Sequence, residues 1–263
     1  MLAAAPGAES FDCRDGILRI AIVSLVAIAV GLAAILAALL VHPYYAHRLA
    51  DMVGSDHRGY RSIVHSDTMQ AVNAARLSQG EETALAFFGA STIERLDIRR
   101  FGSTAVNLAY GGLTSRDVLQ YARGNAAFAE TRTVVVLAGF NDLAAGRSPR
   151  EIADDIAALL ALRLPSKPVL LVGVLPVNPA NLGTASVSNE AIETLNDYLE
   201  ATCREAANCR FVDPARGPHA FSAPLPASLD SGDGIHLNGA GNRQLADLVE
   251  MYLGQSARTR DDG

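Results

Sequence analysis

The chain has 263 residues, of which 49% are hydrophobic and 19% are charged, and its formal net charge is −6. The apolar content argues against a disordered chain, and the acidic balance, with Lys167 as the only lysine, argues against nucleic-acid binding. Three cysteines are too few for a disulfide scaffold of this length. A single uncharged stretch approaches the roughly 20 residues of a membrane span, which excludes a multispan membrane protein.

The apolar excess is concentrated near the amino terminus. Residues 20–41 contain no charged side chain and a single hydroxyl, that of Ser24. This run is longer than the apolar region of a cleaved signal peptide, about 7–15 residues, and it lacks the polar face of a surface helix. Tyr44 and Tyr45 follow it and suit the membrane interface. We therefore expect one transmembrane signal anchor at residues 20–41, after a short tail at residues 1–19.

The charges that flank this run bear on its orientation. Two arginines precede it and three follow it: Arg14, Arg19, Arg48, Arg58 and Arg61. Because Arg19 abuts the run, the positive-inside rule favours a cytoplasmic amino terminus and a main domain on the extracytoplasmic side. Cys203 and Cys209 are close enough in sequence to pair in an oxidising compartment, although two unpaired thiols fit the sequence equally well. Cys13 would lie on the cytoplasmic side.

Residues 42–80 are expected to form a juxtamembrane linker with a helix over residues 62–77. Four of the six histidines lie in this linker: His42, His47, His57 and His65. No pair of them has the i, i+4 spacing of a helical metal site. Solvated side chains are therefore the favoured interpretation, and no metal is predicted.

From residue 81 onward, short apolar runs alternate with longer amphipathic segments. Strands are expected at residues 84–89, 104–108, 133–138, 168–175 and 210–212. Helices are expected at residues 114–130 with a break at Gly124, and at 149–164, 189–205 and 240–253. Most strand runs are continuously apolar, as in parallel strands covered on both faces. The alternation predicts an α/β domain over residues 81–256, with a parallel sheet of about five strands, and a polar tail at 257–263.

Ligands of such sheets bind beyond the carboxyl ends of the strands, so the residues that follow each strand are the candidates for function. Ser91 follows the first strand, either as the N-cap of a helix in a capping box with Glu94 or as an exposed nucleophile. It is not in an α/β-hydrolase elbow, because Ile93 replaces the second glycine of that motif. Gly112 follows the second strand, either in an ordinary turn or as a backbone donor to a site.

Two further segments at this edge carry polar residues. Asn141 follows the third strand, either in an Asn-Asp turn or as an amide aimed at a developing oxyanion. Asp233 and His236 precede the last helix, either in an Asp-Gly turn that leads to a cap at Asn238 or as an acid–base pair. With Ser91, these residues supply a nucleophile, a base, an orienting acid and oxyanion donors at one edge of the sheet.

Four blocks carry a family resemblance, in this order: Gly89-Ala90-Ser91, Asn107 to Gly112, Gly139-Phe140-Asn141-Asp142 and Asp233-Gly234-Ile235-His236. They resemble the blocks of the SGNH (GDSL-like) hydrolases, over about residues 84–253 of the chain. The resemblance implies a flavodoxin-like three-layer α/β/α fold and ester hydrolysis without a metal or cofactor. Two positions depart from the family pattern, because Ala90 replaces the Asp of G-D-S and Leu113 replaces an Asp that often follows the second-block glycine.

Carried over residue by residue, the resemblance makes Ser91, Asp233 and His236 a catalytic triad, and it places the oxyanion hole at Ser91, Gly112 and Asn141. The expected enzyme is a serine ester hydrolase that acts on carboxylic esters of a small molecule, glycan or lipid through an acyl-enzyme. An O-acyltransferase acting on envelope sugars and a non-catalytic binding domain on a membrane stalk are the alternatives. The loop at residues 176–181 is either a proline-rich turn or part of an acyl pocket.

Overall fold

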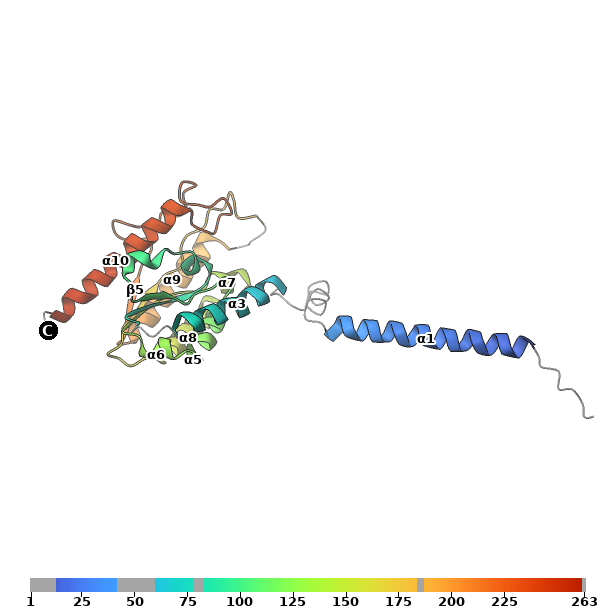
Figure 1. Cartoon of the computed structure of the whole chain (residues 1–263). Coiled ribbons are helices and arrows are strands. Elements are labelled where there is room, and N and C mark those ends of the chain that lie inside the picture. Colours follow the sequence, from blue (N-terminus) through green and yellow to red (C-terminus); the bar gives the residue numbers. More distant parts are fainter. Residues whose placement is uncertain (1–12, 42–59, 78–82, 184–186, 262–263) are drawn as a thin grey trace, which may run out of the picture. The chain divides into compact units, whose positions relative to one another are not determined.

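The structure, a computed structural model, describes residues 13–41, 60–77, 83–183 and 187–261. It divides into two compact units, Met1–Ile63 and Val64–Gly263. The first unit contains α1 (Cys13–Val41), a helix that includes the run predicted to span a membrane (Figure 1). Within that run the side chains of residues 20–35 and 37 are described. In the described part of the chain, no helix is both long and apolar enough to cross a membrane.

Most of the predicted linker lies outside the described residues. His42, His47 and His57 fall there, and the side chain of His65 is likewise not described. The helix predicted at residues 62–77 is present as α3 (Tyr60–Leu77).

The second unit is built on a parallel sheet with the strand order β2-β1-β3-β4-β5. The strands are β1 (Leu85–Gly89), β2 (Ala105–Asn107), β3 (Thr133–Leu137), β4 (Val169–Val172) and β5 (Cys209–Val212). All four strand pairs are parallel, which confirms the predicted five-stranded sheet. The order is that of flavodoxin-like folds, in which ligands bind where the chain reverses its direction of winding, here between β1 and β3.

Helices cover both faces of this sheet and complete the expected three-layer arrangement (Figure 1). The longer ones after α3 are α5 (Ser115–Arg123), α8 (Pro149–Leu160), α9 (Asn189–Glu205) and α10 (Gly239–Asp261). The short ones are α4 (Ser91–Glu94), η1 (Ile98–Phe101), α6 (Ala126–Glu130) and α7 (Phe140–Ala144). The predicted break near Gly124 is confirmed between α5 and α6. α10 instead runs on to Asp261 through the predicted tail, because residues 255–261 contain neither Pro nor Gly to end it.

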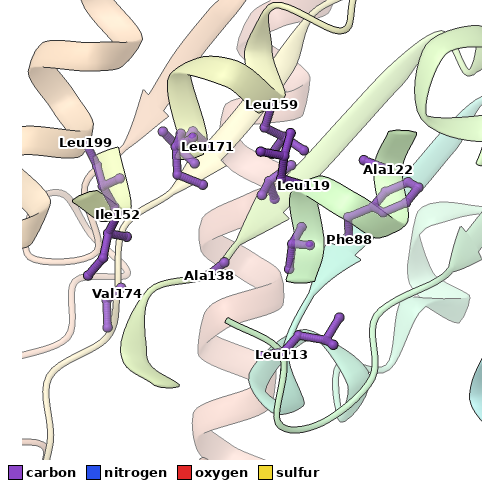
Figure 2. Packing of buried hydrophobic residues seen from close by; sticks show 14 of the residues in the cluster. Phe88, Leu113, Leu119, Ala122, Ala138, Ile152, Leu159, Leu171, Val174 and Leu199 are labelled. Carbon is purple, nitrogen blue, oxygen red and sulfur yellow. The ribbon is translucent and has the colours of Figure 1, made fainter. Parts of the chain in front are cut away.

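Alternate side chains of each strand fill two separate cores. Phe88 and Val136 point to the face covered by α5, α8 and α9, and Phe87 and Val135 point to the face covered by α10. Figure 2 shows the first core, to which the helices contribute Leu119, Ile152, Leu159 and Leu199. Since the strands are buried on both faces, their sequences have no polar alternation, which is why the runs are continuously apolar.

α3 is fixed to the end of the edge strand β2. The buried Asn73 donates from Nδ2 to the carbonyl oxygen of Leu108 at 2.9 Å, and Arg76 donates from Nη1 to the carbonyl oxygen of Asn107 at 2.8 Å. From Val64 on, this helix therefore belongs to the same compact unit as the sheet.

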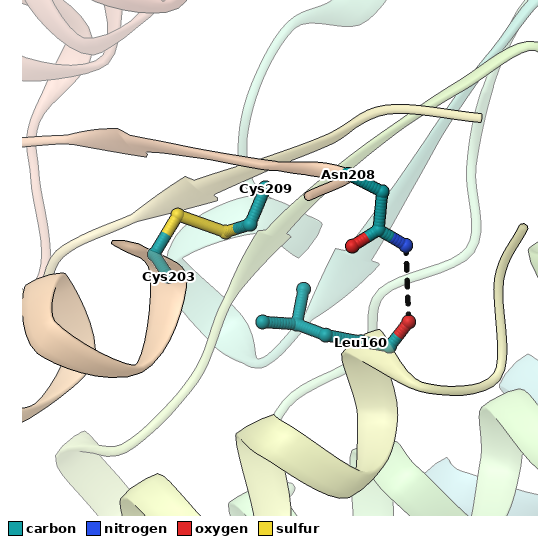
Figure 3. The surroundings of a disulfide bond; sticks show 4 residues. All are labelled: Leu160, Cys203, Asn208 and Cys209. Atoms are coloured by element: carbon teal, nitrogen blue, oxygen red, sulfur yellow. Dashed lines mark hydrogen bonds between the residues drawn. A yellow bond between two sulfur atoms is a disulfide. The ribbon is translucent and has the colours of Figure 1, made fainter. Parts of the chain in front are cut away.

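Cys203 and Cys209 form a disulfide bond with an S–S distance of 2.07 Å, so the paired alternative is confirmed. The bond joins the last turn of α9 to the first residue of β5 (Figure 3). Beside it, Asn208 donates from Nδ2 to the carbonyl oxygen of Leu160 at 3.1 Å, which ties the segment just before β5 to the end of α8. Closing so short a loop stabilises the fold by about 2 kcal/mol.

Candidate active site

Ser91 lies just beyond the carboxyl end of β1, at the turn into α4. Gly89 ends β1 with a φ of +150°, and a Cβ there would lie 2.2 Å from the carbonyl oxygen of Leu137. Glycine is therefore required for the chain to turn this close to β3. The N-cap of α4 is Ala90, so of the two alternatives for Ser91 the capping box with Glu94 is wrong. As the first helical residue, Ser91 is left with a hydroxyl that the helix does not use.

Three side chains form a chain of hydrogen bonds that ends at this hydroxyl. The Oγ of Ser91 lies 2.9 Å from Nε2 of His236. On the other side of the ring, Nδ1 of His236 lies 2.6 Å from Oδ2 of Asp233. The residues predicted as nucleophile, base and orienting acid are thus brought together, although Ser91 and His236 are 145 positions apart in sequence.

The loop that carries Asp233 also holds its second carboxylate oxygen. Oδ1 accepts hydrogen bonds from the backbone N–H groups of His236 at 2.8 Å and Ile235 at 3.0 Å. Desolvation opposes ionisation, but the hydrogen bonds from the backbone and ring of His236 and from Ile235 hold the pKa of Asp233 well below its usual range. An ionised Asp233 favours the imidazole tautomer with its proton on Nδ1, which leaves Nε2 to accept the Ser91 proton.

The predicted oxyanion donors come from the segments after β2 and β3, the two strands that flank β1. Gly112 lies in the loop after β2, and Asn141 lies in the short helix α7 of the loop region after β3. The two loops are joined directly, because Asn141 donates from Nδ2 to the carbonyl oxygen of Leu113 at 2.8 Å. The loop after β2 is also tied to β1, since the N–H of Tyr110 donates to the carbonyl oxygen of Gly89 at 3.3 Å. Gly112 and Asn141 therefore flank Ser91 at the same edge of the sheet.

Two backbone donors at this edge have no protein acceptor. Within the described residues, no oxygen accepts a hydrogen bond from the N–H of Ser91 or of Gly112. The space beside Gly112 is open, with no described atom within 4 Å of where a Cβ would lie. These N–H groups, with the second N–H of the Asn141 amide, can donate to an oxygen bound next to Ser91.

Behind the two loops lies a buried ionic cluster formed by Asp142, Ser115, Arg147 and Asp155. Asp142 is fully buried and accepts hydrogen bonds from the backbone N–H of Ser115 at 2.7 Å and from its Oγ at 2.8 Å. Arg147 contacts Asp142 through Nη1, and its Nη2 lies 2.7 Å from Oδ2 of Asp155. Burial raises the pKa of Asp142, against the opposing effects of Ser115 and Arg147. Because Asp142 follows Asn141 and Ser115 begins α5, the cluster fixes the two loops to each other.

The loop at residues 176–181 packs against the segment that carries Asp233 and His236. Asn178 and Asn181 both donate from their side chains to Asp230, a buried residue that the sequence interpretation does not single out. Whether this loop also lines an acyl pocket stays a prediction. Among the residues that the structure describes, no group of three His, Cys, Asp or Glu side chains is placed to hold a metal ion.

The family model of the GDSL-like lipase/acylhydrolase family matches residues 70–244. Since this match covers well over half of the chain, the chain belongs to this family, as the four sequence blocks predict. It is accordingly a hydrolase of the SGNH type, a class that acts on esters. The match begins within α3 and ends within α10.

Solved structures share the fold. A Streptococcus pneumonia protein, provisionally described as a platelet activating factor, is 22% identical, with 73% of this chain and 94% of that chain covered and a TM-score of 0.65. A GDSL-like lipase from Bacteroides thetaiotaomicron is 22% identical, with 72% and 97% covered and a TM-score of 0.58. A Bacteroides fragilis protein, provisionally described as an acylhydrolase, is 21% identical, with 71% and 96% covered and a TM-score of 0.59. No curated protein sequence matches the chain.

Proposed function

We propose that the chain is a serine esterase that hydrolyses carboxylic esters through an acyl-enzyme on Ser91. The observation that carries this proposal is the hydrogen-bonded chain from Ser91 through His236 to Asp233. It lies at the edge of the sheet where the backbone N–H groups of Ser91 and Gly112 have no acceptor among the described residues. Membership of the GDSL-like lipase/acylhydrolase family supports the ester as substrate.

The mechanism follows from the roles of these groups. Ser91 attacks the ester carbonyl through Oγ while His236 takes the hydroxyl proton on Nε2, and Asp233 stabilises the imidazolium. The negative oxygen accepts hydrogen bonds from the N–H groups of Ser91 and Gly112 and from the amide of Asn141. The bond to the alcohol breaks, and His236 protonates the leaving oxygen. Water, deprotonated by His236, then attacks the acyl-enzyme and releases the acid and free Ser91.

Replacing the nucleophile tests this proposal directly. We expect Ser91→Ala in the full-length chain to lower hydrolysis of a short p-nitrophenyl ester by at least about 10³-fold. The same variant should lose labelling by a fluorophosphonate. Ser103, an exposed serine before β2, provides the matched control, because Ser103→Ala should change neither readout. A folded Ser91→Ala variant with wild-type hydrolysis would show that another residue carries the chemistry.

The same assay separates the alternative functions. A chain-length series of p-nitrophenyl esters defines the acyl group that the site accepts. If esters are consumed only when a sugar acceptor is added, the chain is an O-acyltransferase and not a hydrolase. If no ester from the panel is consumed with or without an acceptor, a non-catalytic binding domain becomes the better description.

We further propose that residues 20–41 anchor the protein in a membrane as a single pass. The support is the uncharged run of 22 residues in the sequence, together with the exposure of its large aliphatic side chains, such as Ile28 and Leu32, in α1. The full-length chain should sediment with membranes and resist alkaline carbonate, whereas Ile28→Arg with Leu32→Arg should not. Leu164→Arg, at an exposed leucine of the second unit, is the control. Extraction of the wild-type chain by carbonate would contradict the anchor.

The proposed location of the second unit is the extracytoplasmic side. The Cys203–Cys209 disulfide supports this, because disulfides persist in oxidising compartments and are rare in the cytosol. Alkylation of freshly lysed cells with a maleimide reagent tests it. Both cysteines should be protected until a reductant is added, and free thiols at both positions without reductant would place the unit in the cytosol.

A further inference from the structure

The segment of residues 230–237, here called the acid–base loop, carries Asp233 and His236 but has little regular structure of its own. Among the described residues it contains one isolated antiparallel β-bridge, between Asp230 and Leu237. The N–H of Ser231 also donates to the carbonyl oxygen of His236 at 2.8 Å. Neither contact ties the loop to the sheet. The placement of the imidazole against Ser91 must therefore depend on contacts with other segments.

Asp230 supplies such contacts from a buried position, with 6% of its surface exposed. Its Oδ1 accepts hydrogen bonds from the backbone N–H groups of Gly232 at 2.9 Å and Gly234 at 3.0 Å. Its Oδ2 accepts from Nδ2 of Asn178 at 3.1 Å and from Nδ2 of Asn181 at 2.7 Å. One oxygen thus holds the acid–base loop, and the other holds the loop after β4.

All four donors are uncharged. Desolvation opposes ionisation, but the hydrogen bonds from Asn181, Gly232, Gly234 and Asn178 lower the pKa of Asp230. The carboxylate is therefore ionised at neutral pH and acts as an acceptor at both oxygens, which matches the four N–H groups that face it. An amide at this position could satisfy at most one side of this arrangement.

The two loops that Asp230 joins are also in backbone contact. The N–H of Asn178 donates to the carbonyl oxygen of Gly234 at 2.8 Å. A Cβ on Gly234, whose φ is +77°, would lie 2.6 Å from the carbonyl oxygen of Asn178 and 2.8 Å from the nitrogen of Leu182. The acid–base loop therefore rests on the loop after β4, with the Asp230 carboxylate beside the contact.

We propose that Asp230 is a positioning residue that fixes the acid–base loop on the loop after β4 and so sets the distance between His236 and Ser91. This proposal rests on the esterase function proposed above. Asp230 touches neither the ester nor the reacting atoms and acts through Asp233 and His236. A displacement of about 1 Å at a reacting group can lower turnover about 10²-fold, so this contact has a measurable effect on rate.

Asp230→Asn is the primary variant, assayed in the full-length chain with a short p-nitrophenyl ester. The new amide leaves one oxygen for Gly232 and Gly234 but turns an N–H₂ group toward that of Asn178. Asn178 cannot rotate in response without losing the hydrogen bond that its Oδ1 accepts from the N–H of Ala180. We expect kcat to fall about 10–100-fold with KM within twofold, and fluorophosphonate labelling to slow by a similar factor. Asp213→Asn is the matched control, since it changes a loop carboxylate after β5, and both constants should stay within twofold.

A donor–acceptor exchange provides the rescue. In the double variant Asp230→Asn with Asn178→Asp, the new amide donates to the new carboxylate, while the second oxygen of residue 178 still accepts from the N–H of Ala180. The amide of Asn181 can rotate to present its oxygen. We expect kcat to recover at least fivefold over Asp230→Asn alone. A recovery below twofold would overturn the proposal.

Stability and positioning are separated by two further variants. Cys203→Ser with Cys209→Ser destabilises the same unit far from the loop, and it should keep the kcat of the wild type. If Asp230→Asn does not fold, Asn181→Ala removes a single donor at an exposed residue and should lower kcat about threefold or more at unchanged KM. An unchanged kcat in the folded Asp230→Asn or Asn181→Ala variant overturns the proposal.

Ser91→Ala is assayed in the same series, so that the esterase function and the positioning role of Asp230 are tested independently. If Ser91→Ala keeps hydrolysis, the esterase assignment to this site is wrong. If Ser91→Ala is inactive while Asp230→Asn behaves as the wild type, the assignment stands and the positioning role alone is wrong.

Discussion

Two parts of the candidate site are held in place by different chemistry. The loops with Gly112 and Asn141 are backed by the buried ionic cluster, in which Arg147 joins Asp142 to Asp155. The acid–base loop is backed by Asp230, whose four hydrogen-bond donors are all uncharged. The donors to the oxyanion are thus held by ion pairs between one arginine and two carboxylates, and the proton-transfer pair is held by uncharged N–H groups.

Because the contacts differ in charge, substitutions in the two parts should have different effects on stability and on kcat. Removing Arg147 leaves the fully buried Asp142 without a counter-charge, which is costly to the whole fold. Removing one amide donor from Asp230 leaves three others, so the expected result is a displaced loop in a folded protein. Loss of a charge in the ionic cluster should therefore lower the stability of the fold first, and loss of a donor to Asp230 should lower kcat first.

Loss of the cation in the ionic cluster should have the largest effect on stability. Arg147→Met should lower the free energy of unfolding by about 3 kcal/mol, because Asp142 and Asp155 lose their counter-charge. Urea denaturation of the full-length chain measures it. Arg216→Met is the control, since Arg216 is an exposed partner of Asp213 and its loss should cost less than about 1 kcal/mol. Equal losses in the two variants would contradict a special role for the cluster.

The next effect concerns a donor to the oxyanion. Asn141→Ala should lower kcat roughly 10²–10³-fold, because the transition state loses one hydrogen bond that stabilises its negative oxygen. Steady-state kinetics on a short ester measures it. Asn125→Ala removes the N-cap of α6 and should cost about 1 kcal/mol of stability with kcat unchanged. If the kcat of Asn141→Ala stays within threefold of the wild type, Asn141 is not a donor to the oxyanion.

The Cys203–Cys209 disulfide lies at neither of these loops, so its removal changes stability without touching the site. Cys203→Ser with Cys209→Ser should lower the free energy of unfolding by about 2 kcal/mol. The kcat should be unchanged, since the bond lies at the amino end of β5 and Ser91 lies beyond the carboxyl end of β1. Thermal unfolding and ester kinetics on the same preparation measure both. A fall in kcat would mean that stability loss alone slows the reaction.

The smallest effect is a pH dependence of opposite sign in the two parts. The pKa of Asp233 is lowered in the folded state, so its contribution to stability is present above the unfolded value of about 3.9 and is lost as the pH falls below it. The pKa of Asp142 is raised, so its contribution is present in acid and is lost as the pH rises through the folded value. Unfolding of the wild type, Asp233→Asn and Asp142→Asn at pH 7 and pH 3 measures both signs.

Much of the fold follows from the sequence, because burial on both faces leaves a strong local signal. Four of the five strands match their predicted runs to within one residue at each end, and β4 begins within one residue of its run but ends three residues before it. Local sequence also sets the starts of two helices, because Thr114 with Asp117 caps α5 and Ser148 with Glu151 caps α8. Sheet topology places Ser91 at the edge where ligands bind, and the resemblance of the four blocks to SGNH hydrolases associates it with Asp233 and His236.

The contacts that hold the site in place could not be predicted, because they join residues far apart in the sequence. Asp142 and Asp155 reach Ser115 from 27 and 40 residues away, and Asp230 reaches Asn178 from 52 residues away. Nothing in the neighbouring sequence distinguishes these carboxylates from solvated ones. The capping-box alternative at Ser91 is wrong for the opposite reason. The local pattern is present, but the tight turn at Gly89 makes Ala90 the N-cap of α4.

The unpaired N–H groups of Ser91 and Gly112 set a limit on how stable this edge of the sheet can become. In the resting protein they donate to no described protein group, so water must satisfy them until a substrate oxygen arrives. Any substitution that brings a protein acceptor to these groups would raise the stability of the fold and occupy the position of the oxyanion at the same time. Stabilising changes at this edge are therefore expected to slow the enzyme, whereas stabilising changes at the opposite end, near Cys203 and Cys209, carry no such conflict.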